Sequence, residues 1–133
     1  MAAPMWRMIP LALFVTLVGG CDDGCGNEII ARSDAPGGAH SAVMFERNCG
    51  ATTGFSTQMS IVSSGEQPSG AGNAFVADDD HGAAATGDWG GPRAEMIWLA
   101  PDHLRIRYAA KSRFFKQEDK VSGVKISYEP VAR

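Results

Sequence analysis

The sequence predicts an all-β domain: a small antiparallel sandwich, an open barrel or a meander of about seven short strands, after an N-terminal signal segment. Short runs with an apolar residue at every second position recur along the chain, which is typical of strands. Turn-forming Gly, Pro, Asn and Asp residues separate these runs. No stretch has the apolar spacing of a long helix. Because the chain has only 133 residues, we expect a single domain.

The expected strands are, in order, residues 28–33, 41–47, 55–62, 73–77, 94–99, 103–108 and 123–128. Residues 113–116 form either a further short strand or a helical turn. Alternation in 55–62 predicts a half-buried strand with Phe55, Thr57, Met59 and Ile61 on its buried face. In 103–108, Leu104, Ile106 and Tyr108 are expected to point inward and Arg105 and Arg107 outward.

A long glycine-rich region, residues 63–93, interrupts this pattern. It contains seven of the sixteen glycines of the chain and few large apolar residues, apart from the short strand expected within it. Loops of this length in compact domains are usually functional or mobile. We therefore expect a single β domain over residues 28–133 with a functional or mobile loop in its middle.

The N-terminus has the features of a bacterial export signal. Arg7 precedes an apolar run that is too short to span a bilayer comfortably and that stops at Val18-Gly19-Gly20-Cys21. This ending resembles the lipobox of bacterial lipoproteins, in which small residues precede the cleaved bond and the following Cys receives the lipid. We expect residues 1–20 to be a signal peptide and residues 21–27 a lipidated Cys21 with its tether. An ordinary secreted protein and an uncleaved anchor are the alternatives.

Lipidation predicts a periplasm-facing domain anchored in the bacterial cell envelope. The acidic Asp22 after the lipid site resembles the signal that retains enteric lipoproteins at the inner membrane. The processed chain would have 133 − 20 = 113 residues and, with 11 basic against 15 acidic residues, a net charge of −4. This acidity, without a dense Lys/Arg stripe, argues against nucleic acid as a partner. The chain has no second apolar stretch of membrane-spanning length.

The chain has three cysteines. If Cys21 carries lipid, Cys25 and Cys49 remain in an oxidising compartment, and a disulfide between them is the simplest outcome. It would close a loop of about 25 residues, worth roughly 3–4 kcal/mol, and would pin the tether to the first hairpin. A reactive Cys49 and a metal site are the alternatives.

The segment Cys49-Gly-Ala-Thr-Thr-x-Phe-Ser-Thr-Gln resembles a motif of a family of small uncharacterised bacterial exported proteins. The resemblance extends over about residues 25–129 and includes an Asn-x-Phe-x-Ala-Asp…His-Gly segment at 73–82. The turn at 35–38 departs from the family pattern, so the family's turn geometry does not carry over. The resemblance supports the Cys25–Cys49 pairing and implies no activity.

Two polar clusters are candidate sites. Asp78, Asp80 and His81 could bind a divalent cation such as Ca²⁺ if they lie in a loop; a solvated acidic loop is the alternative. Beside Cys49, a surface site for a small ligand or peptide could form, with strand residues that merely face water as the alternative. The side chains of this second cluster are Thr52, Thr53, Ser56 and Gln58.

These observations favour a membrane-anchored lipoprotein that acts as a non-enzymatic binding module, with an envelope protein as a partner. The sequence has no motif for a catalytic nucleophile, and we predict no cofactor apart from the lipid on Cys21. Two alternatives remain: a metal-dependent or hydrolytic enzyme that uses the Asp78–His81 loop, and a structural envelope lipoprotein.

Overall fold

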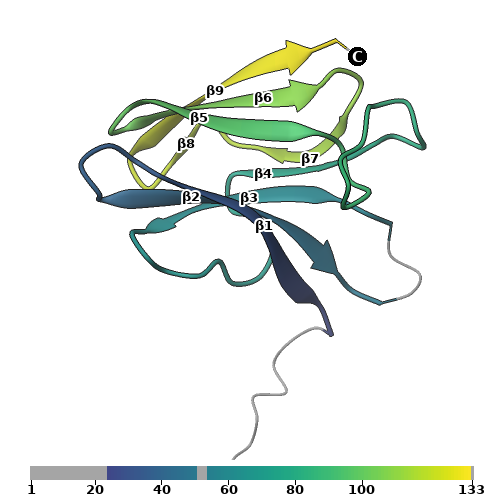
Figure 1. The fold of residues 1–133 in the computed structure, drawn as a ribbon, viewed down its shortest axis with the longest axis horizontal. Helices are drawn as coiled ribbons and strands as arrows, with labels where there is room; N and C mark the ends of the chain where they lie inside the picture. Colours follow the sequence, from purple (N-terminus) through teal and green to yellow (C-terminus); the bar gives the residue numbers. More distant parts are fainter. Residues whose placement is uncertain (1–23, 51–53, 133) are drawn as a thin grey trace, which may run out of the picture.

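The computed structural model describes residues 24–50 and 54–132, and these form a two-layer β sandwich (Figure 1). The strands are β1 (Gly26–Asp34), β2 (His40–Asn48), β3 (Thr57–Ser63), β4 (Phe75–Asp78), β5 (Ala94–Ala100), β6 (His103–Ala109), β7 (Arg113–Gln117), β8 (Lys120–Val121) and β9 (Val124–Val131). The all-β prediction is therefore confirmed. Of the three predicted architectures, the chain forms the sandwich. Within the described ranges, no helix is long and apolar enough to cross a membrane.

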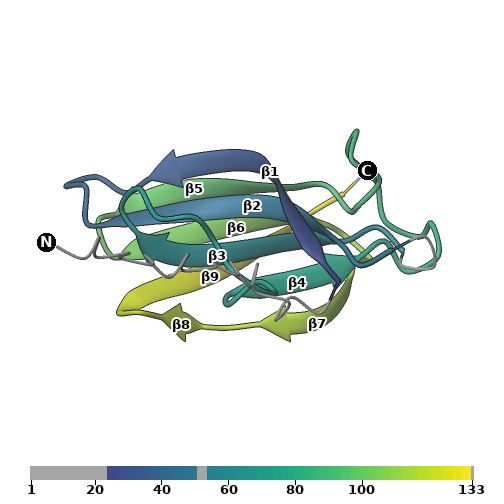
Figure 2. The same cartoon turned by 90° about the horizontal axis from the view of Figure 1, so that it is seen from below.

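One sheet has the strand order β1-β2-β3-β4-β7 and the other β5-β6-β9-β8. Figure 2 shows the two layers from below, with β7 and β8 continuing along the same side of the molecule. Neighbouring strands are antiparallel except β6 and β9, which run parallel, with Leu104 opposite Ile126. A parallel pair needs a crossover connection, and here the chain makes it by passing through β7 in the other sheet.

The core lies between the two sheets. It is formed by every second residue of the strands, whose side chains point inward. Leu104 and Ile106 point inward from β6, and Arg105 and Arg107 point outward, as predicted. Phe75, Phe114, Tyr108 and Tyr128 form an aromatic cluster with ring centroids 4.9 to 6.5 Å apart. The buried side chains of this core also include Ala42, Met44, Met59, Ile61, Ala77 and Val124.

The prediction that β3 is half-buried is wrong. All residues from Thr57 to Ile61 are buried, and Gln58 and Ser60 on the outer face are as inaccessible as the core. Phe55, expected on the buried face, precedes the strand and is 59% exposed. The outer face is buried because another part of the chain covers it.

That cover is residues 64–73, which we call the outer strap. Figure 1 shows it looping below β2 and β3. Backbone N–H groups of Gly72 and Asn73 donate to the Gln58 Oε1 (2.8 Å) and the Ser60 Oγ (3.0 Å), so the polar outer face of β3 binds the strap. The Asn73 side chain accepts from the Ile61 N–H and donates to the Ile61 carbonyl, both at 2.8 Å. About a third of the region expected to be functional or mobile is therefore a structural cover.

Strand boundaries differ slightly from the sequence prediction. β1 begins at Gly26, so it includes two residues that were assigned to the tether. Residues 113–116 lie within β7, which is the strand alternative. The two-residue β8 was not predicted, because a strand this short has no alternation to detect.

Candidate functional site

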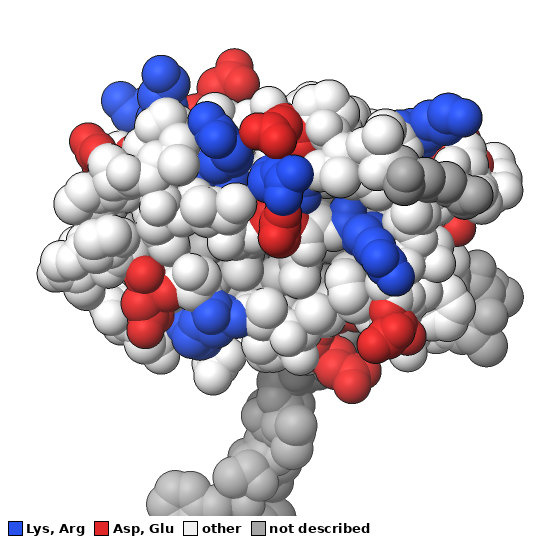
Figure 3. Space-filling model, turned by 45° about the horizontal axis from the view of Figure 1, so that its top comes forward, with Lys and Arg blue, Asp and Glu red and all other residues white. Residues whose placement is uncertain are grey.

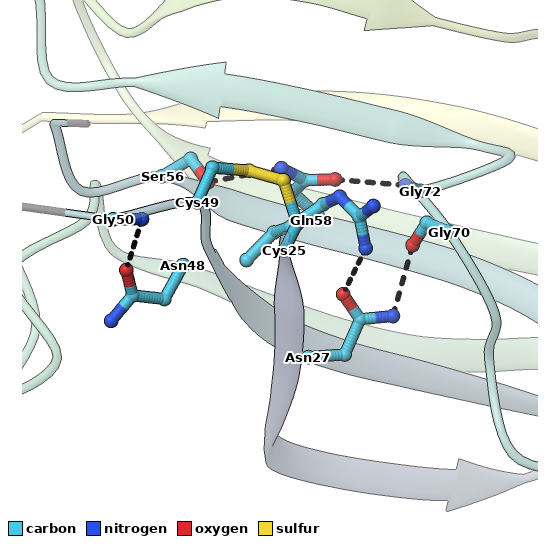
Figure 4. Close-up of a disulfide and its surroundings, with 10 residues drawn as sticks. Cys25, Asn27, Asn48, Cys49, Gly50, Ser56, Gln58, Gly70 and Gly72 are labelled. Atoms are coloured by element: carbon cyan, nitrogen blue, oxygen red, sulfur yellow. Dashed lines mark hydrogen bonds between the residues drawn. A yellow bond between two sulfur atoms is a disulfide. The ribbon is translucent and has the colours of Figure 1, made fainter. Parts of the chain in front are cut away.

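The disulfide between Cys25 and Cys49 is present, with the two Cα atoms 3.9 Å apart (Figure 4). It closes the open end of the β1–β2 hairpin, where Gly26 is the register partner of Asn48. Next to it, Asn27 accepts a hydrogen bond from Arg47 (2.7 Å) and donates one to the Gly70 carbonyl (2.9 Å). The disulfide therefore fixes the first described residues of the chain to the hairpin and, through Asn27, to the outer strap.

The predicted polar surface cluster takes part in this same packing. Thr52 and Thr53 lie outside the described residues. The Gln58 amide is buried, donates to the Ser56 Oγ (3.1 Å) and accepts from Gly72 (Figure 4). Ser56 and Gln58 thus hold the strap in place. Cys21, the predicted lipid site, also lies outside the described residues.

The structure places Asp78 at the end of β4, opposite Arg113 on β7. Arg113 donates two hydrogen bonds to the two carboxylate oxygens of Asp78, and the Asp80 N–H donates a third (2.9 Å). The hydrogen bond from Arg113 is the main reason that the pKa of Asp78 is lowered. Asp80 and His81 follow in a left-handed turn, with φ of 51° and 56°.

The cation-binding hypothesis for Asp78, Asp80 and His81 receives no support from this arrangement. Arg113 already neutralises the Asp78 carboxylate. In residues 24–50 and 54–132, no three His, Cys, Asp or Glu side chains converge in a way that could hold a metal ion.

A pocket of about 480 Å³ lies at the end of the sandwich where the loop before β5 meets the end of β9. We call it the end pocket. Trp89 and Tyr108 supply aromatic walls and Val131 an aliphatic one. Ligand sites commonly have volumes of about 300–1,000 Å³ and mostly apolar walls with a few polar groups. The end pocket has both properties.

Small residues create the space. They are Ala85, Gly87, Ala94, Ala109 and Ala132. Gly87 has a particular reason to lack a side chain, because a Cβ there would lie 2.2 Å from the Trp89 ring. The tryptophan therefore lies directly over the backbone of Gly87.

Two hydrogen bonds fix the orientation of Trp89. Its Nε1–H donates to the Thr57 Oγ1 (2.8 Å), and the Thr57 hydroxyl donates to the Pro92 carbonyl (2.6 Å). Thr57 is fully buried at the start of β3. The loop that carries the tryptophan is thus attached to the opposite sheet, and the aromatic wall is formed without a ligand.

Four charged residues border the end pocket: Asp88, Arg93, Glu95 and Arg107. Arg107 donates to Glu95 and to Glu129 (3.1 Å), and these two hydrogen bonds raise the Arg107 pKa. Arg93 uses its Nε to donate to the Thr86 carbonyl (2.9 Å). Figure 3 shows the outer face of the β5-β6-β9-β8 sheet coming forward, with basic and acidic side chains interspersed on it.

A second, smaller pocket of about 260 Å³ lies between the outer strap and Ser122. His40 and several serines line it, and the buried His40 Nδ1 has no hydrogen-bond partner among the described residues. A histidine that serves as a catalytic base is normally oriented by a hydrogen bond at its second ring nitrogen. We therefore regard the end pocket as the better candidate site.

The sequence pattern did not predict the end pocket. Its one detectable signal was Trp89, a lone tryptophan among glycines in the loop region 63–93. Alternation places Arg107 and Tyr108 only on the two opposite faces of a strand. The pocket depends on how the loop, β6 and the chain end meet, which alternation does not reveal.

Comparisons with known protein families, curated proteins and solved structures gave no match to this chain. The resemblance to exported bacterial proteins therefore stays a prediction.

Proposed function

We propose that the chain is a lipid-anchored, non-enzymatic binding module of the bacterial cell envelope, and that the end pocket is its binding site. The observation that carries the proposal is the Val18-Gly19-Gly20-Cys21 sequence at the end of the apolar run. A cysteine at that position is the acceptor of the lipid in bacterial lipoproteins. The Cys25–Cys49 disulfide supports export, because disulfides persist in oxidising compartments.

Anchoring at Cys21 would hold the domain close to the membrane. Cys25 is four residues further along the chain and is fixed to β2 by its disulfide. Four extended residues span at most about 14 Å. The lipid would therefore attach within that distance of the β1–β2 hairpin end.

The position of the pocket fits an anchored binding module. Figure 1 shows β1 beginning on the lower side of the sandwich, whereas β9 ends on the upper side. The end pocket includes Val131 and Ala132 at the end of β9. A domain tethered through Cys25 would thus leave the pocket accessible to an envelope component.

The proposal is tested by the intact mass of the protein from native membranes, alkylated with and without prior reduction. We expect a mass that begins at Cys21 and includes acyl chains, and two further thiols that alkylate only after reduction. A Cys21→Ser variant serves as control and should lose both the acyl mass and the membrane association. An unacylated wild-type mass would contradict the anchor. Separation of the inner and outer membranes would show whether Asp22 retains the protein at the inner one.

A further inference from the structure

The end pocket is built in advance for a ligand with a flat apolar face. The Trp89 indole is fixed by the Thr57 hydroxyl, and its ring lies over Gly87. Tyr108 packs edge-to-face against Phe114, with ring centroids 4.9 Å apart. Two aromatic side chains that are fixed before binding lose little conformational entropy when a ligand arrives.

Polar groups at the border of the pocket remain free for a ligand. Within the described residues, the Asp88 carboxylate and the Tyr108 hydroxyl make no hydrogen bond. Arg93 uses only its Nε, which leaves both terminal nitrogens of the guanidinium available. The carboxylate accepts hydrogen bonds and the guanidinium donates them. Neighbouring hydroxyl groups of a ligand can satisfy both, because a hydroxyl can donate and accept a hydrogen bond.

Charge balance indicates that the ligand is neutral. The lining has two acidic and two basic side chains, Asp88 and Glu95 against Arg93 and Arg107. Arg107 is already bound by the carboxylates of Glu95 and Glu129. An anionic ligand such as a phosphate would meet no unpaired cluster of positive charge here.

We propose that the end pocket binds one neutral sugar ring in the hexopyranose form. The apolar C–H face of the ring packs on Trp89, and ring hydroxyls bond Asp88 and Arg93. A sugar ring has an apolar C–H face and an edge of hydroxyl groups. The aromatic ring can pack against the face, and the planar polar side chains beside it can hydrogen-bond to the edge. This inference rests on the proposed function in placing the ligand in the envelope, where a glycan would supply the sugar.

The test follows the indole N–H resonances of Trp89 and Trp98 by nitrogen-15 NMR. The lipidated protein is kept in a phosphocholine detergent, which has no sugar headgroup. The probes are neutral trisaccharides of glucose, galactose, mannose and N-acetylglucosamine, and glycerol controls for a non-specific polyol. Trp98 is an internal control, because its N–H donates to the Ser33 carbonyl at the other sheet.

We expect at least one trisaccharide to shift the Trp89 resonance to saturation while Trp98 stays in place. Ala85→Leu, which fills the pocket, should abolish the shift. Ala71→Leu on the exposed surface of the outer strap should leave the shift unchanged. Asp88→Ala lies on an exposed turn and should weaken binding by about tenfold through lost hydrogen bonds.

Three results would overturn the proposal: no probe shifts Trp89, glycerol shifts it equally, or Ala85→Leu retains the shift. If a trisaccharide binds more tightly than its monosaccharide, the ligand is a sugar within a glycan chain. If the two bind equally, the ligand is a free sugar. An unacylated protein mass would contradict the lipid anchor but would not bear on the Trp89 shifts. The absence of Trp89 shifts would contradict sugar binding but would not bear on the lipid anchor.

Discussion

Several charged side chains in this sandwich are paired with charged residues on the neighbouring strands. Asp78 belongs to an acidic run in the sequence, yet its register partner is Arg113, which binds both of its oxygens. Arg107 likewise lies between Glu95 and Glu129 from the two adjacent strands. Since such pairs form across strands, the sequence neighbours of a charged residue do not show what it binds.

Asp78→Asn is expected to lower stability at neutral pH and to leave it unchanged in strong acid. The Arg113 hydrogen bond lowers the Asp78 pKa, so the ionised carboxylate is favoured by the folded state. That stabilisation is present above the unfolded Asp pKa of about 3.9 and is lost as the pH falls through the lower folded value. Melting temperatures of both proteins from pH 7 downward would measure this. A constant difference at every pH would contradict it.

Gly72→Ala should destabilise the domain by about 1–3 kcal/mol. A Cβ at Gly72 would lie 2.6 Å from the Phe75 carbonyl oxygen and 2.8 Å from that of Met59, and neither backbone atom can move without disturbing β3 and β4. Gly26→Ala is the matched control, because a Cβ there meets nothing within 4 Å. Urea unfolding measures both variants. Equal effects of the two substitutions would show that the close approach is unimportant.

Two features outside the strands stabilise the sheet of β1, β2 and β3: the Cys25–Cys49 disulfide and the outer strap. The disulfide closes the end of the β1–β2 hairpin, and the outer strap covers its outer face. Val43 and Phe45 are fully buried but lie outside the main core, and their register partners are Ser60 and Gln58, which bind the strap. A sheet in so small a domain thereby gains a second apolar layer without a helix.

Replacing both Cys25 and Cys49 by Ser should lower the free energy of unfolding by about 3 kcal/mol. The bond joins residues 24 apart, and its loss increases the conformational entropy of the unfolded chain. Urea unfolding of the double variant measures this, and wild type in reducing agent should give the same value. An unchanged unfolding midpoint would mean that the hairpin end is held by other contacts, such as those of Asn27.

For the whole molecule, contacts between the sheets decide how they pack. The aromatic cluster fills one region between them, and Thr57 attaches the Trp89 loop to β3. On the opposite side, the Trp98 Nε1–H of β5 donates to the Ser33 carbonyl of β1 at 2.9 Å. This last bond joins the edge strands of the two sheets.

Trp98→Phe should cost about 1–2 kcal/mol, because phenylalanine keeps most of the packing and cannot donate to the Ser33 carbonyl. Leu99→Ala on the neighbouring position is the control. Leu99 is 44% exposed, so its truncation should change the stability by less than about 0.5 kcal/mol. Chemical unfolding compares the two variants. A larger effect of Leu99→Ala would contradict the assigned role of Trp98.

Local alternation along the chain predicted the all-β class, most strand positions and the inward face of β6. These depend on local alternation, since the direction of a side chain in a strand follows from its position. Within the candidate site, only Trp89 left a signal in the sequence, as an isolated aromatic residue among glycines.

Tertiary contacts produce the burial of β3 on both faces, the parallel β6–β9 pair, the Asp78–Arg113 pair and the end pocket. Each requires segments that are distant along the chain to meet. Alternation reports whether a face is apolar, and Gln58 and Ser60 look solvent-facing although the strap binds them. The physical reason is that polar side chains can be buried when backbone groups from elsewhere in the fold satisfy their hydrogen bonds.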